Sequence, residues 1–229
     1  MLHNDMAANM TTISNFIARA SEEKIDLLCF PECSLTGYVR DFNTVDANKV
    51  MKALDHIQEQ MIHDAVNIIV GVPYVERGKR FNSAIVLLTD GKRYIYHKIN
   101  LTSSERVYFD SGTRPLTFPV KGVIFGVLIC RDQNDAMLAH TYKTRGVDAL
   151  VILAAHFYEP REAIQKLDKN RALPIARAVE NGLFVLKANA VGSANGTISC
   201  GGSMIVDPNG SVIQEADQRT ETILSCKLE

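Results

Sequence analysis

The stretch Val123-Ile-Phe-Gly-Val-Leu-Ile-Cys-Arg-Asp-Gln-Asn-Asp135 joins an unbroken apolar run to a run of polar residues. The apolar half predicts a fully buried strand over residues 123–129, and the polar half leads into a predicted helix near residues 135–145. A second apolar run at residues 149–153 predicts the next buried strand. This strand–helix–strand succession indicates an α/β fold.

Similar patterns extend in both directions from this stretch. Apolar residues at helical spacing predict three further helices, at residues 10–22, 47–60 and 161–181, with Pro174 expected to kink or split the last. Short apolar runs predict further strands at residues 25–30, 66–72 (stopped by a proline), 183–188, 202–206 and 221–227. Asp90-Gly91 predicts a hairpin between residues 81–89 and 92–98, and residues 207–210 predict a turn. Hairpins mixed with helical crossovers favour an α/β sandwich with mixed sheets over an open parallel sheet.

Composition limits the kind of protein. The 229 residues are 46% hydrophobic and 22% charged, as in ordinary globular proteins, and we expect a single domain over residues 1–229. A net charge of −1 gives no bulk attraction to nucleic acid or to anionic membranes. The apolar runs are too short to span a bilayer, and the first residues lack a secretory signal, so we expect a cytoplasmic protein. The five cysteines have no second ligand pair at zinc spacing, and we expect neither a metal nor a cofactor.

Three reactive side chains follow apolar strands. Glu32 comes after residues 25–30 and a proline, Lys98 closes residues 92–98, and Cys130 closes residues 123–129. Ligands of α/β sheets gather at the carboxyl ends of strands, so a carboxylate, an amine and a thiol there form a plausible catalytic set. Each has an ordinary alternative, since Glu32 could be a solvated turn residue, Lys98 a strand-end charge in water, and Cys130 an inert apolar side chain.

Histidine is the usual base for a catalytic cysteine, so a Cys–His pair is a competing hypothesis. The candidates are His97, His140 and His156, and their spacing singles out none of them. Because side chains alternate between the two faces along a strand, we expect His97 and Lys98 to point to opposite faces.

The residues around these side chains resemble the nitrilase superfamily, the carbon–nitrogen hydrolases. Residues 30–38 (FPECSLTGY) resemble the motif around its glutamate, and residues 96–101 (YHKINL) its lysine motif, followed by Glu105. Residues 126–132 (GVLICRD) resemble the nucleophile motif. The family's C-terminal landmarks are matched by residues 177–181, Asn189, residues 201–203 and residues 207–210.

The resemblance implies a role for each matched residue. Glu32 would be the general base, Lys98 would stabilise the intermediate, Cys130 would be the nucleophile and Glu105 would orient Lys98 or the substrate. The implied fold is a four-layer α-β-β-α sandwich, and the implied assembly is a homodimer or a higher homo-oligomer. The implied activity is hydrolysis of a non-peptide C–N bond in a small amide or N-carbamoyl compound, through a thioester and with release of ammonia.

The sequence departs from the family pattern at two places. The family begins with a strand before its first helix, whereas residues 5–9 already occupy the helix start, so we expect that strand to be absent and the chain to be less stable for it. After Cys130, Arg131-Asp132 replaces the Trp-Glu typical of true nitrilases. Arg131-Asp132 argues against nitriles, and nitrile hydrolysis stays as an alternative on the same catalytic residues. The absent first strand keeps a non-catalytic binding role as a further alternative. We expect substrate contacts from Arg131, Gln133, His156 and Phe157.

Overall fold

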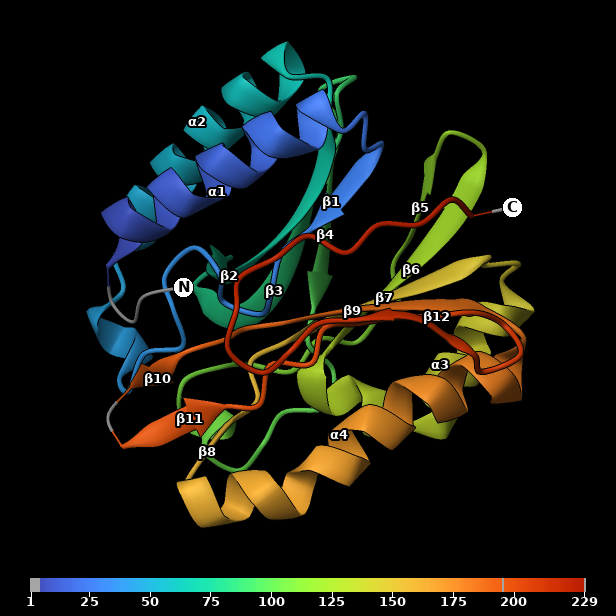
Figure 1. The fold of residues 1–229 in the computed structure, drawn as a ribbon. Coiled ribbons are helices and arrows are strands. Elements are labelled where there is room, and N and C mark those ends of the chain that lie inside the picture. The colour runs from blue at the N-terminus through green and yellow to red at the C-terminus, as the bar shows by residue number, and fades with distance from the viewer. Residues whose placement is uncertain (1–4, 195, 229) are drawn as a thin grey trace. The chain divides into compact units, whose positions relative to one another are not determined.

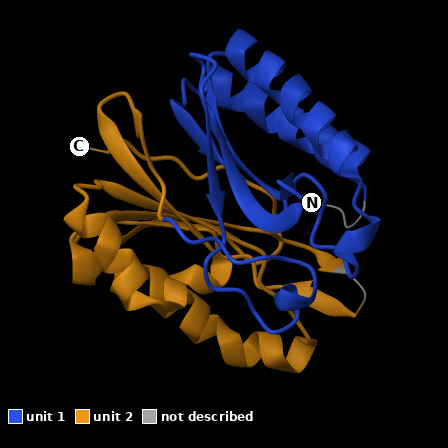
Figure 2. Ribbon diagram, turned by 180° about the vertical axis from the view of Figure 1, so that it is seen from behind, with its two compact units in different colours: residues 1–114 blue, residues 115–229 orange. Residues whose placement is uncertain are grey.

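The computed structural model describes residues 5–194 and 196–228, which form two compact units (Figure 2). Unit 1 is Met1–Arg114 and unit 2 is Pro115–Glu229. Each unit has its own sheets and helices.

Unit 1 is a four-stranded sheet with two helices. Its strand order is β1-β2-β3-β4, with β1 parallel to β2 and the other neighbours antiparallel. Helices α1 and α2 lie side by side along one face of this sheet (Figure 1). Each begins at an aspartate whose carboxylate accepts first-turn N–H groups, and α1 buries Ile13, Ile17 and Ala20 at helical spacing. The elements are α1 (Met6–Glu22), β1 (Leu27–Cys29), η1 (Phe42–Thr44), α2 (Ala47–His63), β2 (Asn67–Glu76), β3 (Lys79–Leu87), β4 (Arg93–His97) and η2 (Glu105–Val107).

Unit 2 is built on a six-stranded mixed sheet in the order β13-β12-β9-β7-β6-β5. Strands β6, β7 and β9 are parallel, and the outer neighbours are antiparallel. Helices α3 and α4 cover one face of this sheet (Figure 1). The elements are β5 (Thr117–Val120), β6 (Val123–Ile129), η3 (Cys130–Asn134), α3 (Ala136–Thr144), β7 (Ala149–Ala154), β8 (Phe157–Tyr158), α4 (Pro160–Asn181), β9 (Phe184–Asn189), β10 (Ser193–Ala194), β11 (Thr197–Ser199), β12 (Met204–Val206) and β13 (Val212–Glu215).

These elements confirm the predicted α/β class with mixed sheets. The strand over residues 123–129 and the Asp90-Gly91 hairpin are where the sequence predicts them. Among the described residues, no strand precedes α1. The sequence analysis missed β5 and β13, and it missed the small sheet formed by β10, β11 and β8.

Two predictions about single segments were wrong, and for a third, the kink or split at Pro174, the split was wrong. Residues 221–227 form no strand. Strand β2 continues through Pro73 because its pairing with β1 ends at Ile69, while its register with β3 runs on. Helix α4 is not split at Pro174. A proline cannot donate to the carbonyl four residues earlier, and the Lys187 ammonium donates to that carbonyl, Asn170 O, at 3.0 Å.

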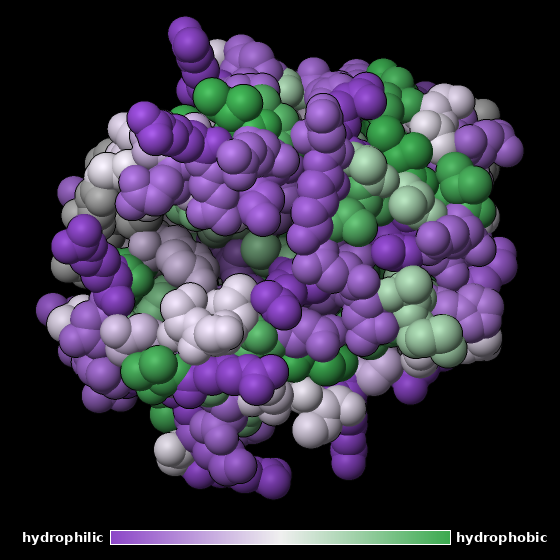
Figure 3. Space-filling model, turned by 90° about the horizontal axis from the view of Figure 1, so that it is seen from below, coloured by the Kyte–Doolittle hydropathy of each residue, from purple (hydrophilic) through white to green (hydrophobic). Residues whose placement is uncertain are grey.

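The polarity of the surface is that expected from a chain with 22% charged residues. The face in Figure 3 is mostly hydrophilic, with hydrophobic residues in small separate groups. None of the helices in the described part of the chain is long and apolar enough to cross a membrane.

Candidate active site

Glu32 lies in the turn after β1, and the backbone of this turn is held against β2. Phe30 N donates to Ile69 O, and Leu35 N donates to Gly71 O. A Cβ on Gly71 would lie 2.4 Å from Pro31 O, so only glycine allows this approach. Glu32 is 2% exposed, so the alternative of a solvated turn residue is wrong.

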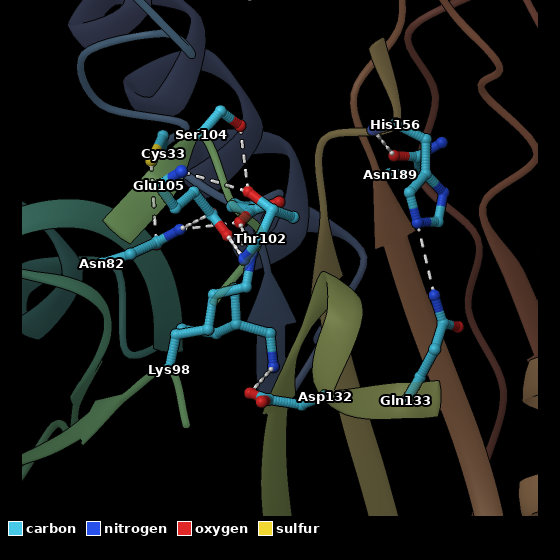
Figure 4. Close-up of polar contacts among 12 residues, drawn as sticks. Cys33, Asn82, Lys98, Thr102, Ser104, Glu105, Asp132, Gln133, His156 and Asn189 are labelled. Atoms are coloured by element: carbon cyan, nitrogen blue, oxygen red, sulfur yellow. Dashed lines mark hydrogen bonds and ion pairs between the residues drawn. The ribbon is translucent and has the colours of Figure 1, made fainter. Parts of the chain in front are cut away.

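Lys98 follows β4 and reaches two carboxylates in unit 1. Its Nζ donates to Glu32 Oε1 at 2.7 Å and to Glu105 Oε1 at 2.6 Å. Asn82 Nδ2, from β3, donates to the same two oxygens at 2.7 and 3.0 Å. Figure 4 shows the side chains of Asn82, Lys98 and Glu105 converging. Lys98 is 1% exposed, which excludes the alternative of a strand-end charge in water.

Glu105 is fixed from its own side as well. Its Oε2 accepts from Thr102 N at 2.8 Å, and its own N–H donates to Thr102 Oγ1 at 3.2 Å. The residue is buried, not an exposed loop charge. We refer to Glu32, Asn82, Lys98 and Glu105 as the carboxylate–lysine cluster.

The two carboxyl groups of this cluster differ in proton affinity. Burial raises the pKa of Glu32, and the neighbouring Glu105 charge raises it further against the opposing effect of Lys98. Burial acts on Glu105 in the same direction, but the Lys98 charge and the hydrogen bonds from Lys98, Thr102 and Asn82 outweigh it and lower its pKa. Glu105 is therefore the carboxyl that favours its charged form beside Lys98, and Glu32 is the one that more readily holds a proton.

Asn82 is the member of the cluster that the sequence analysis missed. The local signal was a polar pair, Asn82-Ser83, between the apolar residues Phe81 and Ala84, and both residues of the pair are fully buried. Its role depends on a partner 50 residues away along the chain, which periodicity does not reveal.

In unit 2, Cys130 stands at the point where β6 turns into η3. Its φ of +46° is unusual for a residue with a side chain, and such strain is found where a side chain must be aimed. Two contacts fix the turn: Asp132 Oδ2 accepts from Ile129 N at 3.0 Å, and Arg177 Nε donates to Gln133 O at 2.8 Å. Arg177 is also ion-paired with Glu180. Buried contacts thus hold a strained backbone on both sides of the thiol.

The four predicted substrate contacts have different surroundings in unit 2. Gln133 and His156 are both buried, with Gln133 Nε2 3.3 Å from His156 Nε2 (Figure 4). Asn189 Oδ1 accepts from His156 N at 3.1 Å. Arg131 is exposed, and Phe157 is half-buried in β8.

The other two candidate histidines lie in different surroundings. His97 stacks on Phe81 with ring centroids 4.0 Å apart, and its Nδ1 lies 2.7 Å from Ser83 Oγ. Burial lowers the pKa of His97. His140 is exposed on α3.

The possible metal ligands are the His, Cys, Asp and Glu side chains of the described residues. In the part of the chain that the structure describes, no three His, Cys, Asp or Glu side chains are grouped as metal ligands would be. The described cysteines form no disulfide bond with one another.

Comparison with known families decides where the chain belongs. The sequence profile of the Carbon-nitrogen hydrolase family matches residues 2–229. The chain belongs to this family. It is 30% identical over 215 residues to the (R)-stereoselective amidase of Pseudomonas sp., covering 93% of this chain and 76% of that protein. It is 27% identical to the 2-oxoglutaramate amidase of Bacillus subtilis, covering 94% and 83%.

Solved structures show the same carbon–nitrogen hydrolase fold. The NitN amidase of Nesterenkonia sp. AN1 matches with a TM-score of 0.85 and 26% identity, over 95% of this chain and 85% of that one. A variant of that amidase carries acrylamide, added by Michael addition, on its active-site cysteine, and another was solved in complex with butyramide. The nitrilase-superfamily fold predicted from the motifs is confirmed.

Proposed function

We propose that this carbon–nitrogen hydrolase is a cysteine-dependent amidase that cleaves small amides or N-carbamoyl compounds, with both units acting as one domain over residues 1–229. The observation that carries the proposal is the buried carboxylate–lysine cluster, in which one carboxyl has a raised pKa and the other a lowered pKa beside a shared ammonium. The amidase relatives support the choice of an amide as substrate.

The proposed reaction begins with the thiol. Glu32 accepts the proton of Cys130, and the sulfur attacks the amide carbon, which places negative charge on the carbonyl oxygen. The Lys98 ammonium and the Arg131 N–H stabilise this oxyanion. Glu32 then returns its proton to the leaving nitrogen, the C–N bond breaks, and ammonia leaves a thioester on Cys130.

Hydrolysis of the thioester uses the same groups. Glu32 takes a proton from water, the hydroxide attacks the thioester carbon, and the C–S bond breaks to give a carboxylic acid. The proton passes back to the sulfur, which restores the thiol. No cofactor is needed for either half of this cycle.

Glu105 holds Lys98 in place and keeps it charged in this proposal. The two bonds to Lys98 and Thr102 support that positioning role. We assign substrate contacts to Arg131, Gln133, His156 and Phe157. Burial of Gln133 and His156 suits contacts with an enclosed polar group, and the exposed Arg131 suits a substrate carboxylate.

We also propose a cytoplasmic homodimer or higher homo-oligomer acting on a small molecule, not on nucleic acid or membranes. The thiol state of the described cysteines supports a reducing compartment. Exposed apolar side chains on the two helices of unit 2, Met137, Ile164 and Val179, support an association surface.

The decisive experiment compares Cys130→Ala with Cys226→Ala over a panel of amides, N-carbamoyl compounds and nitriles. We expect Cys130→Ala to lower kcat at least about 10³-fold and the control to keep its activity. Intact mass measurement of Glu32→Gln should reveal a stalled thioester that names the acyl group.

Other outcomes would replace the proposal with one of its alternatives. Preference for nitriles would indicate a nitrilase. Loss of turnover in a His156 variant but not in Lys98→Ala would indicate a Cys–His enzyme. No turnover and no reaction of Cys130 with iodoacetamide would indicate a binding protein.

A further inference from the structure

Unit 2 contains a cavity of about 570 Å³ that the proposed reaction does not use. Its wall is formed by α4, by the C-terminal half of β9, and by residues 200–204 and 215–219. This volume lies in the range of small-molecule binding sites, which is about 300–1,000 Å³. The cavity is larger than a single inorganic ion requires.

The close approach of two backbone segments shapes one wall of this cavity. Gly201 has a φ of +50°, and a Cβ there would lie 2.5 Å from Gln218 Cα. Gly202 N donates to Asp217 O at 3.1 Å. A glycine at position 201 therefore lets residues 217–218 close against residues 200–202 and complete the wall.

Two buried hydrogen-bond donors face this cavity. Lys187 is 4% exposed, and its bond to Asn170 O uses one of the three N–H groups of the ammonium. Asn170 is 5% exposed, and its Nδ2 makes no hydrogen bond of ordinary geometry, although its side chain lies close enough to Tyr158 and Cys200 to oppose the raised pKa of each. A buried donor left without an acceptor costs free energy, so both side chains favour a ligand that accepts hydrogen bonds.

Two of the three acidic side chains in the wall already accept hydrogen bonds, and the third, Asp168, is exposed. Both carboxylate oxygens of Glu215 accept from Arg171 Nε, at 3.2 and 3.0 Å. Asp217 accepts from Arg219 N, Thr220 N and Thr220 Oγ1. The buried polar side chains that line the cavity, Lys187 and Asn170, therefore face it with donors.

We propose that this cavity is a binding site for a small organic carboxylate, held by the Lys187 ammonium and the Asn170 amide. A carboxylate offers about four lone-pair positions, which match the remaining N–H groups of Lys187 and the Asn170 amide. Bonds of this kind between charged groups are about twice as strong as neutral ones.

The proton affinity of Lys187 gives carboxylate binding at this site a measurable pH dependence. Burial lowers the pKa of Lys187 to about 8, and the nearby Arg171 charge lowers it as well. The neighbours Glu215, Cys200 and Cys130 raise this pKa, but by less than burial lowers it. An anion bound to the ammonium would raise this pKa again. Carboxylate binding near pH 8 must therefore be accompanied by proton uptake.

Calorimetric titration of the whole protein with acetate, succinate, benzoate and phosphate tests the proposal, with benzyl alcohol as the neutral counterpart of benzoate. We expect one saturable site for an organic carboxylate, and no binding of benzyl alcohol. Titrations at pH 8 in buffers of different ionisation enthalpy should show uptake of a fraction of a proton. Lys187→Gln, which keeps a donor for Asn170 O, should weaken binding at least about ten-fold.

Lys169→Gln on the exposed face of α4 is the matched control and should bind like the parent protein. Thermal melts of each variant separate loss of binding from loss of folding. If Lys187→Gln does not fold, Asn170→Asp serves as the second variant, since its added carboxylate pairs with Lys187 and should abolish anion binding.

Three results would overturn the proposal. These are the absence of saturable carboxylate binding by the parent protein, binding that a folded Lys187 or Asn170 variant leaves unchanged, and binding without proton uptake at pH 8. Tighter binding of phosphate than of every carboxylate would replace the assigned ligand class by inorganic oxyanions. None of these measurements depends on turnover at Cys130, so the site and the proposed amidase activity can fail separately.

Discussion

Replacement of Lys98 by methionine isolates the electrostatic contribution of the carboxylate–lysine cluster. The methionine side chain has a similar length, so the change removes the ammonium without leaving a large cavity. Two carboxylate oxygens, Glu32 Oε1 and Glu105 Oε1, then lose a donor at 2.7 and 2.6 Å. Asn82 still donates to both, and Thr102 N still donates to Glu105.

The expected loss of unfolding free energy follows from burial. Removing one partner of a buried ion pair costs about 3–5 kcal/mol, because the remaining charge is left in a medium of low polarity. We expect Lys98→Met to fall in this range at pH 7. That is a large share of the roughly 5–15 kcal/mol typical of a folded domain.

The pH dependence gives the sharper test. Without Lys98, which lowers the pKa of Glu32, the folded-state pKa of that carboxyl rises further above the unfolded value of about 4.3. A raised folded pKa stabilises the folded state as pH falls from the folded pKa toward the unfolded one. In the parent protein, the lowered pKa of Glu105 adds stability above the unfolded pKa, and Lys98→Met loses that contribution. The stability difference between the two proteins should therefore narrow from pH 7 to pH 5.

Urea unfolding of both proteins at pH 5, 6 and 7 measures this difference. Lys79→Met is the control, because Lys79 forms an exposed pair with Asp110 at 3.6 Å and should lose at most about 1 kcal/mol. A loss below 1 kcal/mol for Lys98→Met would refute the reasoning. So would a difference that stays constant or widens as the pH is lowered.

Two further changes test how the fold sets up Glu32. Glu105→Gln removes a charge that raises the pKa of Glu32, so the acidic limb of the kcat/KM profile should move to lower pH. We also expect kcat to fall at least about ten-fold. An acidic limb that does not move would contradict the coupling between the two carboxyl groups. Gly71→Ala places a Cβ 2.4 Å from Pro31 O and 2.5 Å from Cys33 N, so the turn that carries Glu32 must move. We expect the unfolding free energy to fall by about 1–3 kcal/mol and kcat to change more than KM. Full activity in a stable variant would show that catalysis tolerates a displacement of Glu32.

Local sequence patterns were sufficient for much of the fold. Residues 123–129 are apolar without interruption, and Asp90-Gly91 is a strong hairpin signal, so the strand and the hairpin were predicted close to where they occur. The prediction failed for residues 221–227, which have strand-like composition but no strand assignment, and Ser225 N donates to the side chain of Gln214 in β13. The predicted split at Pro174 does not occur, and Lys187 supplies the donor that the proline lacks.

The sequence by itself determined the family, the α/β class and the residue types of the candidate site, because motif spacing and hydrophobic period are local properties of the chain. Only the tertiary structure decided that Glu105 is buried, that Asn82 joins it, and that Lys187 faces a cavity. The physical reason is separation along the chain. Glu32 and Lys98 are 66 residues apart, and their proton affinities depend on burial and on partners that no local pattern encodes.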